Sequence, residues 1–217
     1  MEIWLDSVDQ DTIQLGNKLG IIKGVTSNPS LITLSKRSLN EALLSALQSQ
    51  RGPVAAQVTG ETSEEMIEQA EILRDFSERI LIKIPITQEG LKAMSALVNL
   101  QIPVMATAAF TPIQTLLACQ TGVQYIALYF SKIDPKKGQD TLEHMLHSVR
   151  KSPKETKILA ASLQSEDQVI QCLTHGVHGI TLKKELFLEI IQDSPQTLEA
   201  LKHFKQDWKK AKPSHLF

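Results

Sequence analysis

Short apolar segments recur eight times along the 217-residue chain, and each is followed by a longer stretch with the apolar spacing of an amphipathic helix. The segments read EIWLD, KGVTS, PVAAQV, ILIKI, PVMAT, QYIALY, KILAAS and GITL. Helices are predicted between them, for example over 63–77 and 88–99. Thr62, Thr111 and Ser165 each precede a predicted first turn and, with the proline after Thr111, are suited to start a helix. This alternation predicts parallel strands joined by right-handed crossovers.

The repeated units run through the chain, 1–217, without a linker or a break in composition, which favours one α/β domain. A single (β/α)8 TIM barrel fits better than an open sheet. Open doubly wound sheets typically have a glycine-rich phosphate turn after the first strand, whereas LDSVDQ follows it here and no G-x-G-x-x-G occurs.

An extra C-terminal helix is predicted at about 196–210, beyond the last repeated unit. Its apolar residues Leu198, Leu201, Phe204 and Trp208 recur at helical spacing. Two interpretations remain open: the helix seals its own barrel, or it docks on a neighbouring subunit.

The charge balance argues against nucleic acid or an anionic membrane surface as a partner, because the formal net charge is −1 without a long run of one sign. The two cysteines, Cys119 and Cys172, can form neither a disulfide framework nor a four-ligand metal cluster, so we expect a reducing compartment. The N-terminus MEIWLDSVDQ has no signal-peptide pattern, and no apolar run approaches the length of a membrane span. We therefore expect a cytoplasmic protein.

Polar side chains stand at the ends of most predicted strands, and the active sites of TIM barrels lie at those C-terminal ends. In chain order the strand-end residues are Asp6, then Thr26 with Ser27 and Asn28, then Gln57, Lys83, Thr107, Tyr129 with Ser131 and Lys132, and Ser162. One such residue alone is often only a cap for the next helix. Their concentration at one face predicts a shared pocket.

Lys83 is the most unusual of these residues, because Ile82 and Ile84 flank it and Pro85 closes the strand. An inward-pointing lysine would be desolvated, and desolvation lowers its pKa by favouring the neutral amine. A shift from about 10.4 to about 7 corresponds to roughly 4.6 kcal/mol. A neutral amine can attack a carbonyl carbon, which predicts imine chemistry on a hydroxylated carbonyl compound. The alternative is a strand-end lysine whose ammonium lies in solvent.

Carbon–carbon cleavage next to an imine also needs groups that move protons. Asp6 can take the proton from the hydroxyl on the carbon that becomes an aldehyde, and Tyr129 and Gln57 can position a water or pass protons. For a phosphorylated substrate, Ser162 and Lys132 are the nearest donors, together with backbone amides of the neighbouring loops.

Metal-assisted cleavage is the rival mechanism. His175 and His178 precede the last strand, which places them near the opposite end of the barrel, and His144 and His147 are simplest as residues of an outer helix face. Neither pair has carboxylates or cysteines at ligand spacing on the catalytic face. We therefore expect no metal and no other cofactor.

Several segments resemble one protein family. GVTSNPSLI resembles the signature segment of the transaldolase family, and LIKIPIT resembles its Schiff-base lysine segment. The similarity continues through LDS, AAQV, ATAAF, YIALYFSKID, LAAS and FKQDWKK, so that it covers essentially the whole chain. The length resembles the small, single-barrel branch that contains fructose-6-phosphate aldolase and short transaldolases. The resemblance implies a homo-oligomer built from pentameric rings, a pentamer or a decamer, with the C-terminal helix crossing between subunits.

By this resemblance Lys83 forms the imine, while Tyr129 with Gln57 and Thr107 manages the catalytic water and protons. Asp6 and Asn28 would hold the sugar hydroxyls, and we place neighbouring Thr26 in the same substrate-binding set. Short transaldolases typically have Glu, Asn and Phe at the positions of Gln57, Thr107 and Tyr129, so all three residues here resemble the aldolase.

Three positions depart from the family pattern. Lys132 stands where relatives have an arginine for phosphate, and Gln164 where they often have a basic residue. Phe110 stands where the aldolase resemblance leads us to expect tyrosine. A lysine lacks the bidentate fork of an arginine, so phosphate dependence is expected to be weaker.

The sequence thus favours a class I aldolase of the fructose-6-phosphate aldolase type, which joins dihydroxyacetone or a related hydroxyketone to an aldehyde such as glyceraldehyde 3-phosphate. The main alternative is a transaldolase, which moves the same three-carbon unit between sugar phosphates. A remote alternative is a non-catalytic barrel that serves as a binding protein.

Overall fold

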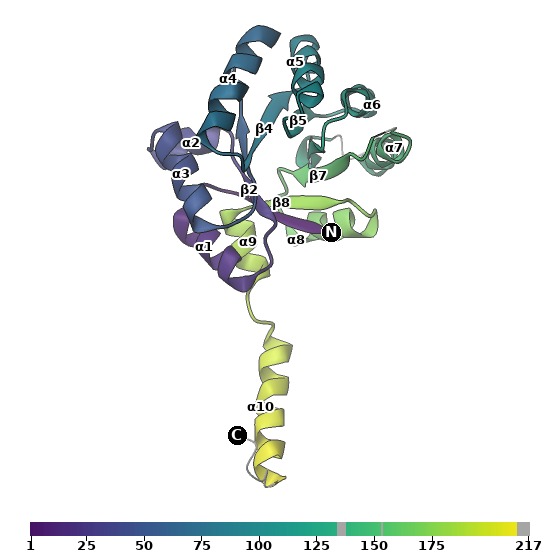
Figure 1. Ribbon diagram of the computed structural model, residues 1–217. Coiled ribbons are helices and arrows are strands. Elements are labelled where there is room, and N and C mark those ends of the chain that lie inside the picture. The colour runs from purple at the N-terminus through teal and green to yellow at the C-terminus, as the bar shows by residue number, and fades with distance from the viewer. Residues whose placement is uncertain (134–137, 153, 212–217) are drawn as a thin grey trace.

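Parallel strands close into a barrel in chain order (Figure 1). The computed structural model describes residues 1–133, 138–152 and 154–211. Its strands are β1 (Glu2–Asp6), β2 (Gly24–Thr26), β3 (Val54–Gln57), β4 (Ile80–Pro85), β5 (Val104–Ala109), β6 (Tyr125–Tyr129), β7 (Lys157–Ala161) and β8 (Gly179–Lys183). Because β1 pairs with both β2 and β8, the sheet has no free edge. The predicted (β/α)8 barrel is therefore confirmed.

Helices cover the outside of the barrel (Figure 1). These covering helices are α1 (Gln10–Leu19), α2 (Pro29–Ser35), α3 (Leu39–Ser49), α4 (Ser63–Phe76), α5 (Gln88–Asn99), α6 (Pro112–Thr121), α7 (Gly138–Arg150), α8 (Glu166–Thr174) and α9 (Lys184–Ile190), and a further helix, α10 (Pro195–Lys210), follows them in the chain. The side chains of Thr62, Thr111 and Ser165 each accept a hydrogen bond from a backbone N–H of the following first turn, so the predicted caps are confirmed. The short helix α2 has no counterpart among the predicted helices.

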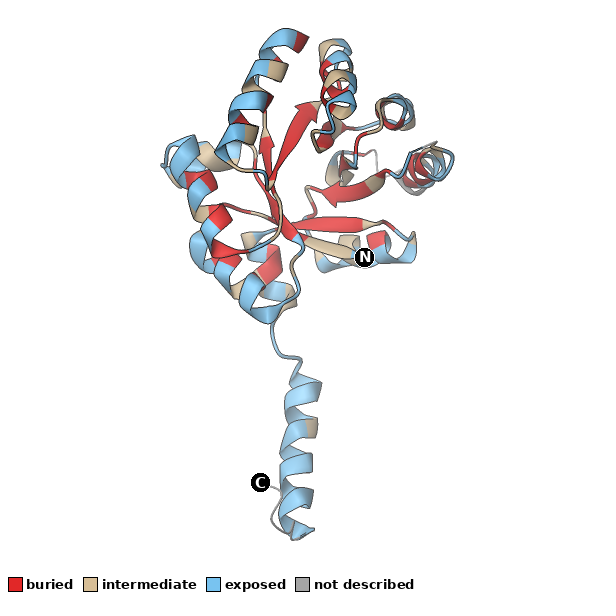
Figure 2. Ribbon diagram, viewed as in Figure 1, coloured by how far each residue is buried: buried red, intermediate tan, exposed pale blue. Residues whose placement is uncertain are grey.

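Two apolar layers lie on the two faces of the barrel wall. The larger layer joins outward-facing strand side chains to the helices. The inner layer consists of Trp4, Ala55, Leu81, Met105, Ala127 and Leu159. Figure 2 shows that the strands between these layers are buried along most of their length. Side chains alternate along a strand, so a residue two positions beyond an inner-layer residue faces the same interior, one step nearer the C-terminal mouth.

The opposite end of the barrel is held by the carboxylate of Glu2. It accepts hydrogen bonds from Trp4 Nε1 and from the Tyr125 hydroxyl, each at 3.0 Å, and pairs with Lys157 Nζ at 2.8 Å. The neighbouring His178 accepts a hydrogen bond from the backbone N–H of Ile158 through its Nδ1 atom. These contacts are made within the fold, as is typical of the stabilising end of such barrels.

The C-terminal helix α10 extends away from the barrel (Figures 1 and 2). None of its residues is buried, and Leu198, Leu201 and Phe204 are 43%, 46% and 67% exposed. The predicted helix is therefore present, but the interpretation that it seals its own barrel is wrong. No helix in the described ranges is both long enough and apolar enough to cross a membrane.

Candidate active site at the barrel mouth

Polar side chains from successive strands converge at the C-terminal mouth of the barrel. Each of the following lies two residues beyond a member of the inner apolar layer: Asp6, Gln57, Lys83, Thr107 and Tyr129. Thr26 joins them, because the β1–β2 register places it beside Asp6. The same alternation that fills the barrel thus aims these groups at one another.

Lys83 lies inside the mouth and is only 4% exposed. Its Nζ atom donates a hydrogen bond to the carbonyl oxygen of Ser27 at 3.2 Å, and Gln57 is its partner in the β3–β4 register. Burial lowers the pKa of Lys83, and the nearby Asp6 carboxylate opposes this effect. The interpretation of Lys83 as a lysine with its ammonium in solvent is therefore wrong.

Asp6 is the acidic partner of this lysine and is half-buried at the end of β1. Thr26 Oγ1 donates to Asp6 Oδ1 at 2.9 Å and lies 2.8 Å from Thr181 Oγ1, so the hydroxyl of Thr181 can donate in turn to Thr26. Burial raises the pKa of Asp6, against the opposing influence of the Lys83 charge and the Thr26 hydrogen bond.

Burial therefore acts on the two groups in complementary ways. It favours the neutral amine of Lys83 and the neutral acid of Asp6 over the two separate charges. A neutral amine is a nucleophile and a protonated carboxyl is a proton donor. The pair can thus attack a carbonyl and protonate the oxygen that leaves.

Thr107 has its hydroxyl on β5, which pairs with the Lys83 strand on the side opposite to β3. Its Oγ1 atom is buried and has no hydrogen-bond partner within the described ranges. The chain bulges directly after it, since Ala108 has a φ of 57° and the β5–β6 register shifts between Ala106 and Ala109. A buried hydroxyl without a protein partner is costly, so this one is suited to hold a substrate atom or a water.

Tyr129 ends β6 and is half-buried at the same mouth. Its ring meets the ring of Phe110 edge-on, with centroids 5.4 Å apart and an angle of 75° between the planes. Phe110 thus orients Tyr129 by packing. Position 110 is the one at which the family resemblance leads us to expect a tyrosine.

The two residues predicted on the phosphate side lie on neighbouring loops. Ser162 follows β7 with a left-handed φ of 63°, and its Oγ atom lies 2.8 Å from Ser131 Oγ. Lys132 ends the short 3₁₀ turn Phe130–Lys132 and is exposed. Gln164 donates a side-chain hydrogen bond to the carbonyl oxygen of Ser162 at 2.8 Å.

Asn28 has a local structural task in addition to its position at the mouth. Its Oδ1 atom accepts the backbone N–H of Leu31 at 3.0 Å and so caps α2. A hydrogen bond from Asn28 also helps to hold down the pKa of Asp6. The amide group of Asn28 thus lies beside Asp6, and its substrate-binding role stays a prediction.

Lys183 is the residue at this mouth that our sequence interpretation missed. The predicted last strand, GITL, ends at Leu182, but β8 continues for one more residue and pairs Lys183 with Asp6. Alternation along β8 from Thr181 was the available signal, because it places Lys183 on the interior side.

The family of the chain follows from comparison with known proteins. The family described as Transaldolase/Fructose-6-phosphate aldolase matches residues 3–215. The chain belongs to this family. A probable transaldolase from Thermoanaerobacter sp. (strain X514) is 34% identical over 213 residues, which are 97% of this chain and 98% of the relative. A probable transaldolase from Petrotoga mobilis is 32% identical over 212 residues, covering 97% and 96% of the two chains.

Solved structures support the fold alone. A mandelate oxidase variant superposes with a TM-score of 0.57 at 13% identity, over 82% of this chain and 60% of that one. This likeness is one of barrel architecture, since sequence identity is too low to carry function.

Replacing Asp6 with asparagine is expected to lower the pKa of Lys83 still further. The substitution removes the Asp6 charge, which raises this pKa, and leaves the burial that depresses it. The titration of a ¹⁵N-labelled Lys83 side chain, followed by NMR, measures the shift. Asp11→Asn, an exposed change on α1, is the matched control and should leave the titration in place. An unchanged or higher pKa in Asp6→Asn would show that the two groups are not coupled.

Proposed function

We propose that this protein is a class I aldolase of the fructose-6-phosphate aldolase type, which reversibly cleaves fructose 6-phosphate into dihydroxyacetone and glyceraldehyde 3-phosphate. The observation that carries the proposal is the buried Lys83 amine beside Asp6 at the mouth of a closed barrel. Family membership supports the same chemistry.

The first half of the reaction forms an imine. Lys83 Nζ attacks the ketone carbon of the sugar, and the carbonyl oxygen becomes a hydroxyl. Asp6 gives its proton to this hydroxyl, which departs as water and leaves a protonated imine on Lys83 and a carboxylate on Asp6. Tyr129, Gln57 and Thr107 hold the water and the neighbouring hydroxyl.

The second half breaks the carbon–carbon bond. The Asp6 carboxylate takes the proton from the hydroxyl on the carbon that becomes the aldehyde, and the electrons of the breaking bond move to the imine nitrogen. The aldehyde leaves, and the enamine that remains takes on carbon the proton that Asp6 has just accepted. Water then attacks the protonated imine, which releases dihydroxyacetone, restores the neutral Lys83 amine and returns one proton to Asp6.

A transaldolase is the second candidate, and the names of the relatives favour it. In that reaction the enamine attacks a second aldehyde instead of taking a proton, so water and acids must stay away from it. Gln57, Thr107 and Tyr129 are three hydrogen-bonding residues on the interior side of β3, β5 and β6, at the mouth where Lys83 lies. These groups favour protonation and hydrolysis, and hence the aldolase.

Borohydride reduction in the presence of dihydroxyacetone is expected to trap a stable adduct on Lys83. Peptide mass mapping identifies the modified residue. Lys83→Ala should lose both the adduct and the activity, and Lys83→Arg should lose turnover, because a guanidinium is never neutral in the working range. Full turnover in Lys83→Arg would rule out the imine mechanism.

Fructose 6-phosphate alone is expected to release free dihydroxyacetone without an acceptor aldehyde, as measured by a coupled reductase assay. Tyr129→Phe should slow this release by ~10²-fold, the typical contribution of one proton-transfer group, while leaving the borohydride adduct in place. Tyr125→Phe alters the other end of the same strand and should change the rate by less than about twofold. Strict dependence on erythrose 4-phosphate would instead identify a transaldolase.

We also propose that the protein is a homo-oligomer in which the apolar face of α10 docks on a second copy of the chain. Leu198, Leu201 and Phe204 are exposed on this helix. Phe204→Asp is expected to reduce the mass measured by sedimentation equilibrium. Gln206→Asp adds the same charge to the opposite face and should leave the mass unchanged. A wild-type protein that sediments as a monomer would contradict the proposal.

A further inference from the structure

Lys183 is a charged residue at the mouth with no assigned role. The β1–β8 register sets it beside Asp6, and it continues the line of Thr181, which contacts the hydroxyl that donates to Asp6. It is exposed, and within the described ranges it makes no hydrogen bond or ion pair. Its neighbour Lys184 pairs with Asp9 at 3.1 Å, whereas the charge of Lys183 acts on Asp6 and helps to hold down the pKa of that carboxyl.

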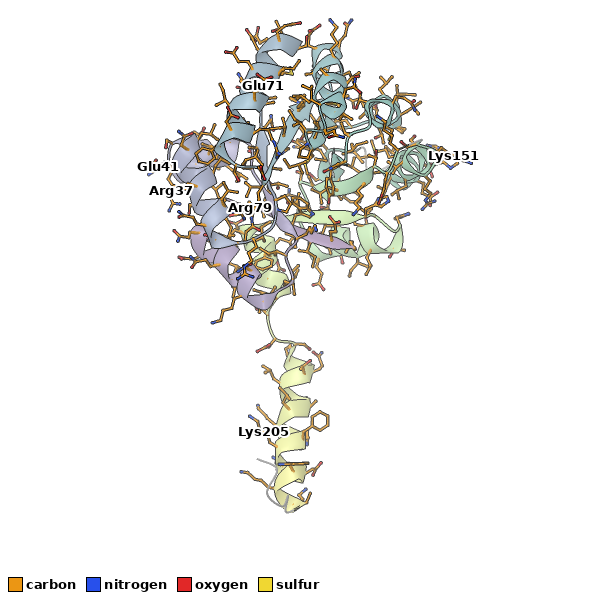
Figure 3. The ribbon with its side chains drawn as sticks, viewed as in Figure 1. Arg37, Glu41, Glu71, Arg79, Lys151 and Lys205 are labelled. Atoms are coloured by element: carbon orange, nitrogen blue, oxygen red, sulfur yellow. The ribbon has the colours of Figure 1, made fainter. Side chains whose placement is uncertain are left out.

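A cavity of about 550 Å³ connects this lysine to the acid. Asp6 and Lys183 both line it, and its outer wall includes Arg37. The guanidinium of Arg37 is partly committed: it donates to Ser45 Oγ at 3.3 Å and lies near Glu41, where α2 ends and α3 begins (Figure 3). Among the described residues that line this cavity, Lys183 is therefore a cation beside Asp6 without a hydrogen bond or an ion pair of its own.

The order of the strands places Lys183 between two groups that the reaction uses. In the barrel β8 lies between β7, which leads to Ser162, and β1, which ends at Asp6. Lys132 and Ser162 thus follow β6 and β7, and Lys183 ends β8, the next strand around the barrel. Barrels of this kind often bind phosphate at the loops after their last two strands.

The chemistry at Asp6 determines which end of the substrate reaches Lys183. Asp6 acts on the hydroxyl of the carbon that becomes the aldehyde, so the rest of the aldehyde portion extends past Asp6. The ammonium of Lys183 would then lie near any charged group on the aldehyde portion. A phosphate at its end fits, because ammonium and phosphate form charge-assisted hydrogen bonds.

We propose that Lys183 binds the phosphate of the aldehyde portion and selects phosphorylated aldehydes over their neutral counterparts. This inference rests on the proposed imine reaction, and it adds a specificity-determining residue on β8 to Ser162 and Lys132. The contact lies away from the reacting carbons, so it contributes equally to the bound substrate and to the transition state, and its loss changes KM rather than kcat.

The test compares glyceraldehyde 3-phosphate with glyceraldehyde as partners of dihydroxyacetone in the synthetic direction. Lys183→Gln is expected to raise KM for the phosphorylated aldehyde by ~10-fold, the scale of one charge-assisted hydrogen bond at an accessible site. The kinetic constants for glyceraldehyde should stay within about twofold. Lys183→Arg should retain the preference, because it keeps the charge.

Two controls separate a phosphate contact from a general loss of charge. Lys184→Gln removes the adjacent lysine, whose ammonium is already engaged by Asp9, and should leave the ratio of the two kcat/KM values within about twofold. Added salt should reduce the wild-type preference and have little effect in Lys183→Gln, because an exposed ion contact is screened.

Borohydride trapping on Lys83 keeps this inference distinct from the proposed function. If wild type and Lys183→Gln both form the adduct and their preferences for the phosphorylated aldehyde are equal, Lys183 is not the phosphate ligand and the aldolase proposal stands. If wild type forms no adduct, the aldolase proposal fails. The phosphate contact can then be tested without turnover, by calorimetric measurement of the Kd of fructose 6-phosphate for Lys83→Met. The double variant Lys83→Met/Lys183→Gln should bind fructose 6-phosphate ~10-fold more weakly. An equal Kd for the two proteins would overturn the inference.

Discussion

The desolvated pair of Lys83 and Asp6 is the constraint on which the site depends. Two charges taken from water at this depth carry a large desolvation cost, whereas a neutral amine beside a neutral acid avoids most of it. The closed barrel makes such burial possible, because parallel pairing satisfies the strand backbones and the inner layer of Trp4, Leu81 and Met105 fills the space beneath. The carbonyl oxygen of Ser27 accepts a hydrogen bond from the amine without adding a charge.

The barrel and most of the mouth could be predicted from the sequence, since both follow from periodicity. Strand–helix alternation implies parallel strands, and alternation within each strand aims Asp6, Gln57 and Lys83 at one space. The remaining features depend on tertiary contacts. Ala108 and Ser162 have left-handed φ values that no local signal at an alanine or serine predicts, and the direction of α10 is not encoded in its own amphipathic pattern. The last residue of β8, Lys183, could also have been predicted from this alternation, but the predicted strand ended at Leu182.

The fate of the enamine separates the two candidate activities, and it depends on what surrounds Lys83. A transaldolase must protect this intermediate until a second aldehyde arrives, which favours apolar groups or groups already occupied by internal hydrogen bonds. Thr107 has a buried hydroxyl with no protein partner in the described chain, and Tyr129 is held by edge-on packing against Phe110. The Thr107 hydroxyl is therefore suited to hold a water or a substrate hydroxyl, which supports the proposed aldolase.

The arrangement also separates the chemistry from the recognition of charge. Lys83 works because it is buried, whereas Lys132 and Lys183 are exposed lysines that keep their ammonium groups in contact with water. A lysine binds phosphate as a point charge, without the bidentate geometry of an arginine, so two of them supply attraction with little orientation. In the proposed reaction, orientation of the substrate then comes from the imine itself and from the expected hydroxyl contacts of Asp6, Thr26 and Asn28. The proposed phosphate contact would set which aldehydes bind well, while the covalent bond to Lys83 would set where the substrate breaks.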